Sequence, residues 1–162
     1  PNRKGAILAL GVPTVGTDDL CEKIESGKIK AMIALGNEIN VPLSDREKAA
    51  FGKLDYLLVI DSWKSDLAEL AHAVLPAAIY AEKEGTFVNS AGRAQHLLQC
   101  LIPEEGQGAS EWVWLKRISD ALDGGWEFNS ASTLFDTVAH EVSEFAGISY
   151  KAMDKGGMLI KE

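Results

Sequence analysis

Apolar and polar positions in the first part of the chain form blocks that predict helices and strands in turn. Residues 17–27 begin with Thr17 and two acidic residues and end at Gly27, which is typical of a short helix with acids at its amino end. Residues 29–35 are then mostly apolar without alternation, as in strands that are covered on both faces. A turn at Gly36 and Asn37 ends this predicted strand.

The same order of elements continues along the chain. A capping box that begins at Ser44 predicts a second helix, and residues 55–61 predict a second covered strand. A helix that starts at Ser65 then leads to a brief third strand at residues 73–75. Strands that alternate with helices in this way predict a parallel sheet with right-handed crossovers.

The pattern changes after residue 82. Residues 83–108 contain short extended pieces on either side of a glycine-containing turn, and they predict a structured loop or irregular hairpin. Two amphipathic helices follow it. The fold class expected is therefore α/β: a partial three-layer, Rossmann-like parallel sheet with a loop or hairpin and trailing carboxy-terminal helices. The expected divisions are half of a dinucleotide-binding-like α/β domain at 1–82, a pocket loop or hairpin at 83–108, and a helical segment at 109–162.

The charge and the cysteine content of the chain argue against several classes of partner and site. The 162 residues include 16 basic and 24 acidic side chains, and the net charge of −8 disfavours nucleic acid and anionic membranes as partners. The longest apolar stretch, 67–81, contains Glu69 and a proline, so we expect no membrane-spanning segment. Cys21 and Cys100 lack metal-ligand spacing, and we expect a reducing, cytoplasmic setting.

The ends of the first two predicted strands carry candidate binding residues. In open α/β sheets, ligands bind beyond the carboxyl ends of the strands. Gly36 and Asn37 follow the first strand, and Asp61 ends the second. The glycine would let the backbone approach a phosphate, and the aspartate would accept from a ribose or a guanine. Alternatively, the glycine only makes a turn and the aspartate caps the next helix.

A second group of candidates lies in the predicted loop. Thr86, Asn89 and Arg93 could line a pocket, with the Arg93 guanidinium binding a phosphate or carboxylate. They could equally pair with one another to hold a long loop in place. No recognisable catalytic motif is present, so no catalytic residue is assigned. The histidines lack metal spacing, and each is interpreted as a helix or surface residue: His72, His96 and His140.

Residues 75–95 resemble the signature of the molybdopterin oxidoreductase family. This signature has a leucine–proline step, an acid–glycine–threonine element, an asparagine, and then glycine–arginine–any residue–glutamine. Residues 2–6 and 145–150 extend the similarity over nearly all of the chain. The resemblance implies that the strand-end and loop candidates named above are cofactor-binding positions, retained or vestigial.

Two branches of this family are compatible with the resemblance. One is the large G-type subunit of NADH–quinone oxidoreductase (respiratory complex I), whose related domain generally holds no pterin; residues 80–89 and 157–160 look closer to it. The other comprises molybdenum or tungsten enzymes such as formate dehydrogenase, which bind pterin guanine dinucleotides. Glu38 stands where the family usually has a proline, and its negative charge near the cofactor phosphates would oppose binding.

The resemblance therefore implies a carboxy-terminal fragment of a G-type subunit, with a structural or docking role in an electron-transfer complex and no chemistry of its own. We expect no metal or cofactor in the fragment, with iron–sulfur clusters in the missing amino-terminal part. Its partners would be other subunits of a redox complex, at the inner face of the cell membrane, and the isolated fragment would self-associate. The alternatives are the guanine-dinucleotide-binding portion of a molybdenum or tungsten oxidoreductase and a free-standing nucleotide-binding or interaction module.

Overall fold

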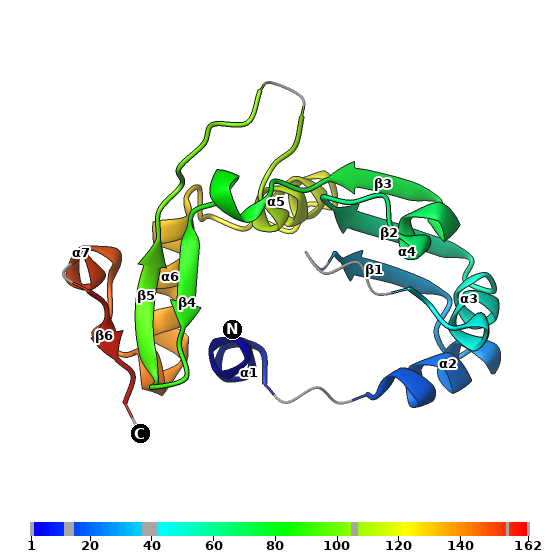
Figure 1. Ribbon diagram of the computed structural model, residues 1–162, viewed down its shortest axis with the longest axis horizontal. Helices are drawn as coiled ribbons and strands as arrows, with labels where there is room; N and C mark the ends of the chain where they lie inside the picture. The colour runs from blue at the N-terminus through cyan, green and yellow to red at the C-terminus, as the bar shows by residue number, and fades with distance from the viewer. Residues whose placement is uncertain (1, 12–14, 37–41, 105–106, 155, 162) are drawn as a thin grey trace. The chain divides into compact units, whose positions relative to one another are not determined.

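The computed structural model describes residues 2–11, 15–36, 42–104, 107–154 and 156–161, and these form two compact units (Figure 1). The first, here called the sheet unit, comprises Val15–Glu82 and Leu101–Gly124. The second, the hairpin unit, comprises Pro1–Thr14, Lys83–Cys100 and Gly125–Glu162. The division of the sequence at residues 82 and 108 stays a prediction. No helix in the described ranges is long and apolar enough to cross a membrane.

The described part of the sheet unit is built around a parallel sheet. Its elements are α2 (Thr17–Glu25), β1 (Ala31–Leu35), α3 (Asp45–Phe51), β2 (Tyr56–Asp61), α4 (Asp66–Leu70), β3 (Ala73–Pro76), the 3-10 helix η1 (Tyr80–Glu82) and α5 (Glu111–Ala121). The strands lie in the order β1-β2-β3, and both pairings are parallel. The capping box is present: the Ser44 hydroxyl accepts from Glu47 N, and the Glu47 carboxylate accepts from Ser44 N at 2.8 Å. The sequence-based prediction of a parallel α/β sheet is thus confirmed.

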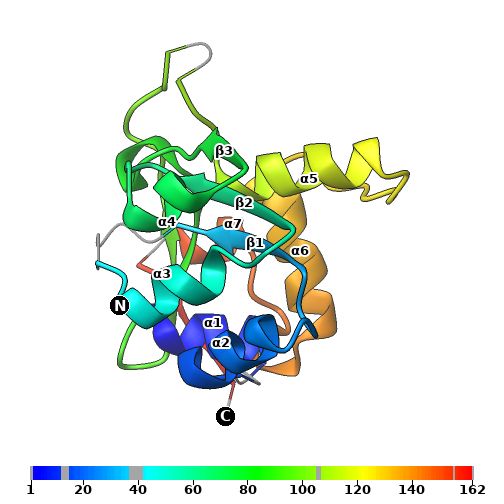
Figure 2. The same cartoon turned by 90° about the vertical axis from the view of Figure 1, so that its right-hand side faces the viewer.

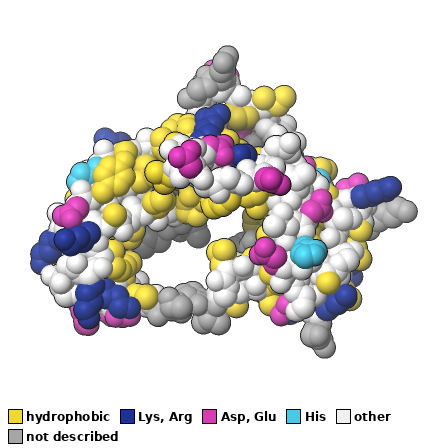
Figure 3. Space-filling model, turned by 180° about the vertical axis from the view of Figure 1, so that it is seen from behind, with side chains coloured by type: hydrophobic (Ala, Val, Ile, Leu, Met, Phe, Trp, Pro, Cys, Tyr) yellow, Lys and Arg dark blue, Asp and Glu magenta, His cyan; other side chains and the backbone are white. Residues whose placement is uncertain are grey.

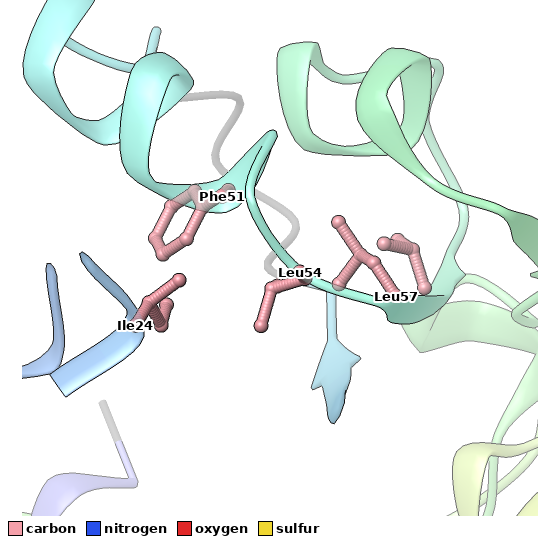
Figure 4. Packing of buried hydrophobic residues seen from close by; sticks show 5 residues of the cluster. Ile24, Phe51, Leu54 and Leu57 are labelled. Carbon is pink, nitrogen blue, oxygen red and sulfur yellow. The ribbon is translucent and has the colours of Figure 1, made fainter. Parts of the chain in front are cut away.

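Helices cover both faces of this sheet, which gives the three layers expected (Figure 2). On one face, Ile24 of α2 and Phe51 of α3 pack with Leu57 and Val59 of β2, together with Leu54 (Figure 4). On the other face, a second cluster contains Leu58, Ile60 and Ala77 under the side chains of α5: Trp114, Leu115 and Ile118. β2 is therefore the central strand, buried from Leu57 to Asp61, with only Tyr56 exposed at its start.

The first strand differs from its prediction. It begins at Ala31, and it is covered on one face only, because Ile33 and Leu35 are 50% and 53% exposed. Met32 and Ala34, which point to the opposite face, pack against the cluster around Leu57. An uninterrupted apolar run indicates a strand that can be buried on both faces, but it does not supply the second covering layer.

The hairpin unit is built on an antiparallel sheet. Its described elements are α1 (Arg3–Leu10), β4 (Gly85–Val88), β5 (Arg93–Leu97), α6 (Ala131–Glu141), the 3-10 helix η2 (Ser143–Phe145), α7 (Tyr150–Met153) and β6 (Met158–Leu159). β4 and β5 form the hairpin, and β6 pairs with the other side of β5. The predicted hairpin and carboxy-terminal helices are present.

Segments from both ends of the chain are attached to this hairpin. The Asn2 side chain accepts a hydrogen bond from Val88 N at 2.7 Å. Gly5 of α1 is buried, and a Cβ atom there would lie 2.9 Å from Val88 Cγ2, so the helix can approach the strand only with glycine at this position. At the other end, Ile160 N donates to Gly92 O at 2.9 Å. Val88 and Ala94 form the hairpin's contribution to the buried core.

Candidate functional site at the strand ends

Gly36 and Asp61 lie side by side at the carboxyl edge of the parallel sheet. Gly36 directly follows β1, and its N–H donates to Ile60 O at 2.6 Å. A Cβ atom on Gly36 would meet the Asp61 carboxyl group and would lie 2.7 Å from Asp61 Cβ. Only glycine permits this approach. The structure thus brings together two of the predicted site residues; Asn37 lies outside the described residues, as does Glu38.

The Asp61 carboxylate organises the loop that follows it. Its Oδ1 accepts from Trp63 N at 3.1 Å, and its Oδ2 accepts from the Ser65 hydroxyl at 3.0 Å. The Ser65 oxygen in turn accepts from Ala68 N at 3.3 Å, which caps α4. The alternative considered for Asp61, a cap of the next helix, is therefore not what the structure shows: Ser65 caps α4, and Asp61 holds the Ser65 hydroxyl. Each carboxylate oxygen can accept more than one hydrogen bond, so the side chain, 8% exposed, retains capacity for a ligand donor.

The loop candidates lie in the hairpin unit, where the Asn89 side chain stabilises its own turn and the Arg93 side chain binds a distant segment. Asn89 Oδ1 accepts from Ala91 N and from Arg93 N, both at 3.0 Å, and its amide nitrogen donates to Gln95 Oε1 at 3.3 Å. The Arg93 Nη1 donates to Gly157 O at 3.0 Å, which ties β5 to the carboxy-terminal segment. Of the internal pairing considered for these residues, the contact between Asn89 and Arg93 is present, and the Thr86 side chain takes no part in it. A cofactor-binding role for them stays a prediction.

Thr86 belongs to a polar cluster that the sequence did not indicate. It faces His96 across the β4–β5 ladder. The His96 Nε2 lies 2.9 Å from Glu84 Oε1, its Nδ1 lies 3.5 Å from Asp154 Oδ1, and its ring packs on Tyr150 with 4.1 Å between centroids. The His96 side chain is only 10% exposed. The interpretation of His96 as a helix or surface residue is wrong, because it lies on a strand that α7 covers.

Two buried polar atoms of this cluster, Thr86 Oγ1 and His96 Nδ1, have no hydrogen-bond partner among the described residues. Burial raises the pKa of the Tyr150 phenol, and the Glu84 and Asp136 carboxylates act in the same direction. The nearby Thr86 hydroxyl acts in the opposite direction and lowers this pKa. Within the described ranges, no three His, Cys, Asp or Glu side chains are grouped to hold a metal ion.

Comparison with known proteins identifies relatives of this chain. The family model for molybdopterin oxidoreductase matches residues 2–121. A protein provisionally named as the oxidoreductase YjgC, from Bacillus subtilis (strain 168), is 33% identical over 144 residues. One provisionally named as the formate dehydrogenase SAB2186c, from Staphylococcus aureus (strain bovine RF122 / ET3-1), is 32% identical over 146 residues. Both alignments cover 88% of this chain.

A solved structure has the same fold. The acetylene hydratase from Pelobacter acetylenicus matches with a TM-score of 0.70 over 94% of this chain, at 17% sequence identity. The chain covers 22% of that structure and spans 14% and 15% of the two sequence relatives.

Proposed function

Because this chain belongs to the molybdopterin oxidoreductase family, we propose that it forms part of the cofactor-holding domain of a molybdenum or tungsten oxidoreductase that acts on formate. The proposal draws on the provisional name of the Staphylococcus relative for the substrate. The observation that carries it is the juxtaposition of Gly36 and Asp61 at the carboxyl edge of the parallel sheet, the edge at which α/β folds bind nucleotides. In such an enzyme the pterin-bound metal supplies the two-electron redox chemistry.

The residues at this edge have the chemical groups that bind a nucleotide. Asp61 is an acceptor with remaining lone-pair capacity, suited to a ribose hydroxyl or to the N–H groups of a guanine. Gly36 leaves no side chain between that carboxylate and the end of β1. The loop residues fit less well, because Asn89 and one N–H donor of Arg93 are already engaged by their own unit. Thr86 retains an unpartnered oxygen within the described residues.

A second candidate function is a structural or docking role in the G-type subunit of NADH–quinone oxidoreductase. The observation that favours it is that Asp61, Asn89 and Arg93 each hydrogen-bond within the protein, since this pairing occupies part of their capacity to bind a cofactor. In that case the chain would carry no pterin, and its partners would be other subunits of a redox complex at the inner face of the membrane. A free-standing nucleotide-binding module has no observation in its favour beyond the same strand-end pair.

The cofactor content of the full-length protein tests these proposals. We expect the purified protein to contain molybdenum or tungsten by mass spectrometry, a fluorescent oxidised pterin, and GMP released by acid hydrolysis. Asp61→Asn should lower the GMP and pterin content about tenfold or more, because a hydrogen bond to a charged acceptor contributes about 1.5–3 kcal/mol. The matched control is Asp55→Asn, which makes the same change just before β2.

The outcomes separate the two candidates. If the wild-type protein contains metal and pterin and reduces a dye in the presence of formate, the first proposal is supported. If it contains metal and pterin but shows no such activity, the cofactor-holding role stands and formate is not its substrate. A wild-type protein without pterin or metal, recovered together with other redox subunits, contradicts the first proposal and favours the second. Equal pterin content in the Asp61 and Asp55 variants would remove Asp61 from the site.

A further inference from the structure

The parallel sheet has one edge that the described residues do not cover. β1 pairs with β2 along one side only. Gly36 N donates toward β2, and because N–H directions alternate along a strand, the N–H groups of Ile33 and Leu35 point to the opposite, outer edge. These backbone groups need hydrogen-bond partners in the complete protein or must remain in water.

The same two residues are exposed on a face of the sheet. Ile33 and Leu35 are in register with Leu58 and Ile60 of β2, so all four side chains point to the same face. Leu58 and Ile60 are 7% and 0% exposed under α5, whereas Ile33 and Leu35 are about half exposed. Hydrophobic side chains also reach the surface elsewhere on the molecule (Figure 3). What is unusual here is an exposed apolar face together with a free strand edge.

The opposite edge of the sheet, at β3, has hydrogen-bond partners within the chain. β3 ends in Pro76, and its line is continued by a parallel bridge between Ala77 and Ala109. Ala109 N donates to Pro76 O at 3.2 Å, and Ala78 N donates to Ala109 O at 2.9 Å. β1, with the sequence Ala-Met-Ile-Ala-Leu, has no charged residue or proline of the kind that protects an exposed edge. The outer edge of β1 therefore has the features of a strand edge that pairs with another strand.

We propose that in the full-length protein a β-strand from another part of the same polypeptide pairs with the outer edge of β1, and that apolar side chains from that part cover Ile33 and Leu35. The present chain spans 14–15% of the length of its sequence relatives, so most of a protein of that size lies outside these residues. A tethered strand has a high effective concentration at the edge. A parallel sheet is normally covered on both faces, and an edge that is uncharged and apolar suits a permanent contact better than a transient one.

Hydrogen exchange in the full-length protein tests the pairing. The Ile33 and Leu35 amides should be protected to an extent comparable with the amides of β2, which is paired on both sides. Exchange as fast as in an exposed strand would overturn the proposal. In the 162-residue chain at low micromolar concentration, the same two amides should exchange at least about a hundredfold faster than in the full-length protein. Equal protection in both proteins would mean that the chain covers its own edge, which also overturns the proposal.

A cross-linking experiment identifies the occupant. A photoreactive benzophenone amino acid replaces Ile33 in the full-length protein, and the same group placed at Leu122, which is 76% exposed beyond α5, serves as the control. We expect the residue-33 cross-link to form within one chain, to a strand outside these 162 residues, with the monomer mass retained. A cross-link to a second copy or to a different protein, or none at all, would overturn the proposal. These readouts do not depend on cofactor content, so the proposal can fail while the proposed function stands.

Discussion

In the sheet unit, His72 accepts a hydrogen bond from Leu57 N at its Nδ1 atom, at 3.0 Å. In the hairpin unit, His96 instead lies between the Glu84 and Asp154 carboxylates and packs on Tyr150. The same contrast holds for the cores. The sheet unit has an apolar core and places its buried carboxylate, Asp61, at the strand ends. The hairpin unit brings polar side chains from several segments together against its core.

This contrast separates two uses of polar groups. At the strand ends, the regular sheet fixes the position of Asp61, and the side chain needs only two hydrogen bonds to set the next loop. In the hairpin unit, little regular structure is available, and side chains such as Asn89 and Arg93 hold the backbone in place. Substitutions should therefore have different consequences in the two units.

The largest effect is expected from Leu57→Ala in the core of the sheet unit. Leu57 is completely buried, and truncation of such a side chain costs about 2–5 kcal/mol. The buried Cys21 in the same unit reports local opening, and its labelling by a thiol reagent should accelerate at least about tenfold. Val88→Ala in the hairpin unit is the comparison and should leave Cys21 labelling unchanged. Equal acceleration by both variants would show that the two units unfold together.

Gly36→Ala should destabilise the sheet unit by about 1–3 kcal/mol, because the added methyl group overlaps the Asp61 carboxyl group. Urea unfolding measures the change. The matched control in the hairpin unit is Gly85→Ala, where an added Cβ atom has no neighbour within 4 Å. If both variants are equally stable, the close approach of Gly36 and Asp61 is not a constraint on the fold.

Asn89→Ala should cost about 1 kcal/mol, because Ala91 N and Arg93 N lose their acceptor. The loss should appear as faster amide exchange at these two positions, with the β1–β2 amides unchanged. Ser90→Ala in the same turn serves as the control. If amide exchange is unchanged in the Asn89 variant, then backbone hydrogen bonds alone stabilise the turn.

Alkaline pH should weaken the hairpin unit through Tyr150. Burial raises the pKa of Tyr150 in the folded state. The stabilising contribution of the neutral phenol is therefore fully present below the usual tyrosine pKa of about 10 and is lost as the pH rises through the raised value. Tyr150→Phe should flatten the fall in stability above about pH 10, whereas Tyr56→Phe on the exposed end of β2 should not. If stability falls with pH equally steeply in both variants, ionisation of Tyr150 is not the cause of the alkaline loss of stability.

Acid should weaken the sheet unit, with the smallest effect of the series. The Lys48 ammonium, 2.8 Å from Asp66 Oδ2, lowers the pKa of Asp66, and a hydrogen bond from Leu43 N assists it. This contribution is present above the usual aspartate pKa of about 4 and is lost as the pH falls through the lowered value. Asp66→Asn should reduce the acid-induced loss of stability slightly, because the pair is partly exposed. Asp120→Asn, which removes the exposed Lys116 pair on α5, provides the comparison.

The sequence predicted the sheet unit well because its signals are local. The capping box at Ser44 and the apolar run that ends in Asp61 each act within a few residues, and both are present as predicted. The strand-end rule also placed Gly36 and Asp61 together. The exposure of Ile33 was missed, because a run of apolar residues does not specify which neighbours will cover it.

The polar cluster of the hairpin unit could not be predicted in the same way. Strand alternation places Thr86 and His96 on one face of the hairpin, but nothing near them in the sequence indicates Tyr150 or Asp154. Contacts across more than fifty residues depend on how the helices pack, which a periodicity in one chain does not encode. The internal bonds of Arg93 are of the same long-range kind, since its acceptor is the Gly157 carbonyl.

The way the hairpin unit is assembled has a consequence for synthesis of the chain. The three strands of the sheet unit lie within Ala31–Pro76 and can pair as soon as this continuous stretch has left the ribosome. Asn2, 86 positions before Val88, has by then already been made, but the hairpin lacks Ile160, whose N–H donates to Gly92 O, until the last of these residues has been synthesised. A nascent polypeptide stopped before residue 157 would thus contain all three strands of the described parallel sheet, whereas its antiparallel sheet would lack the last strand, β6.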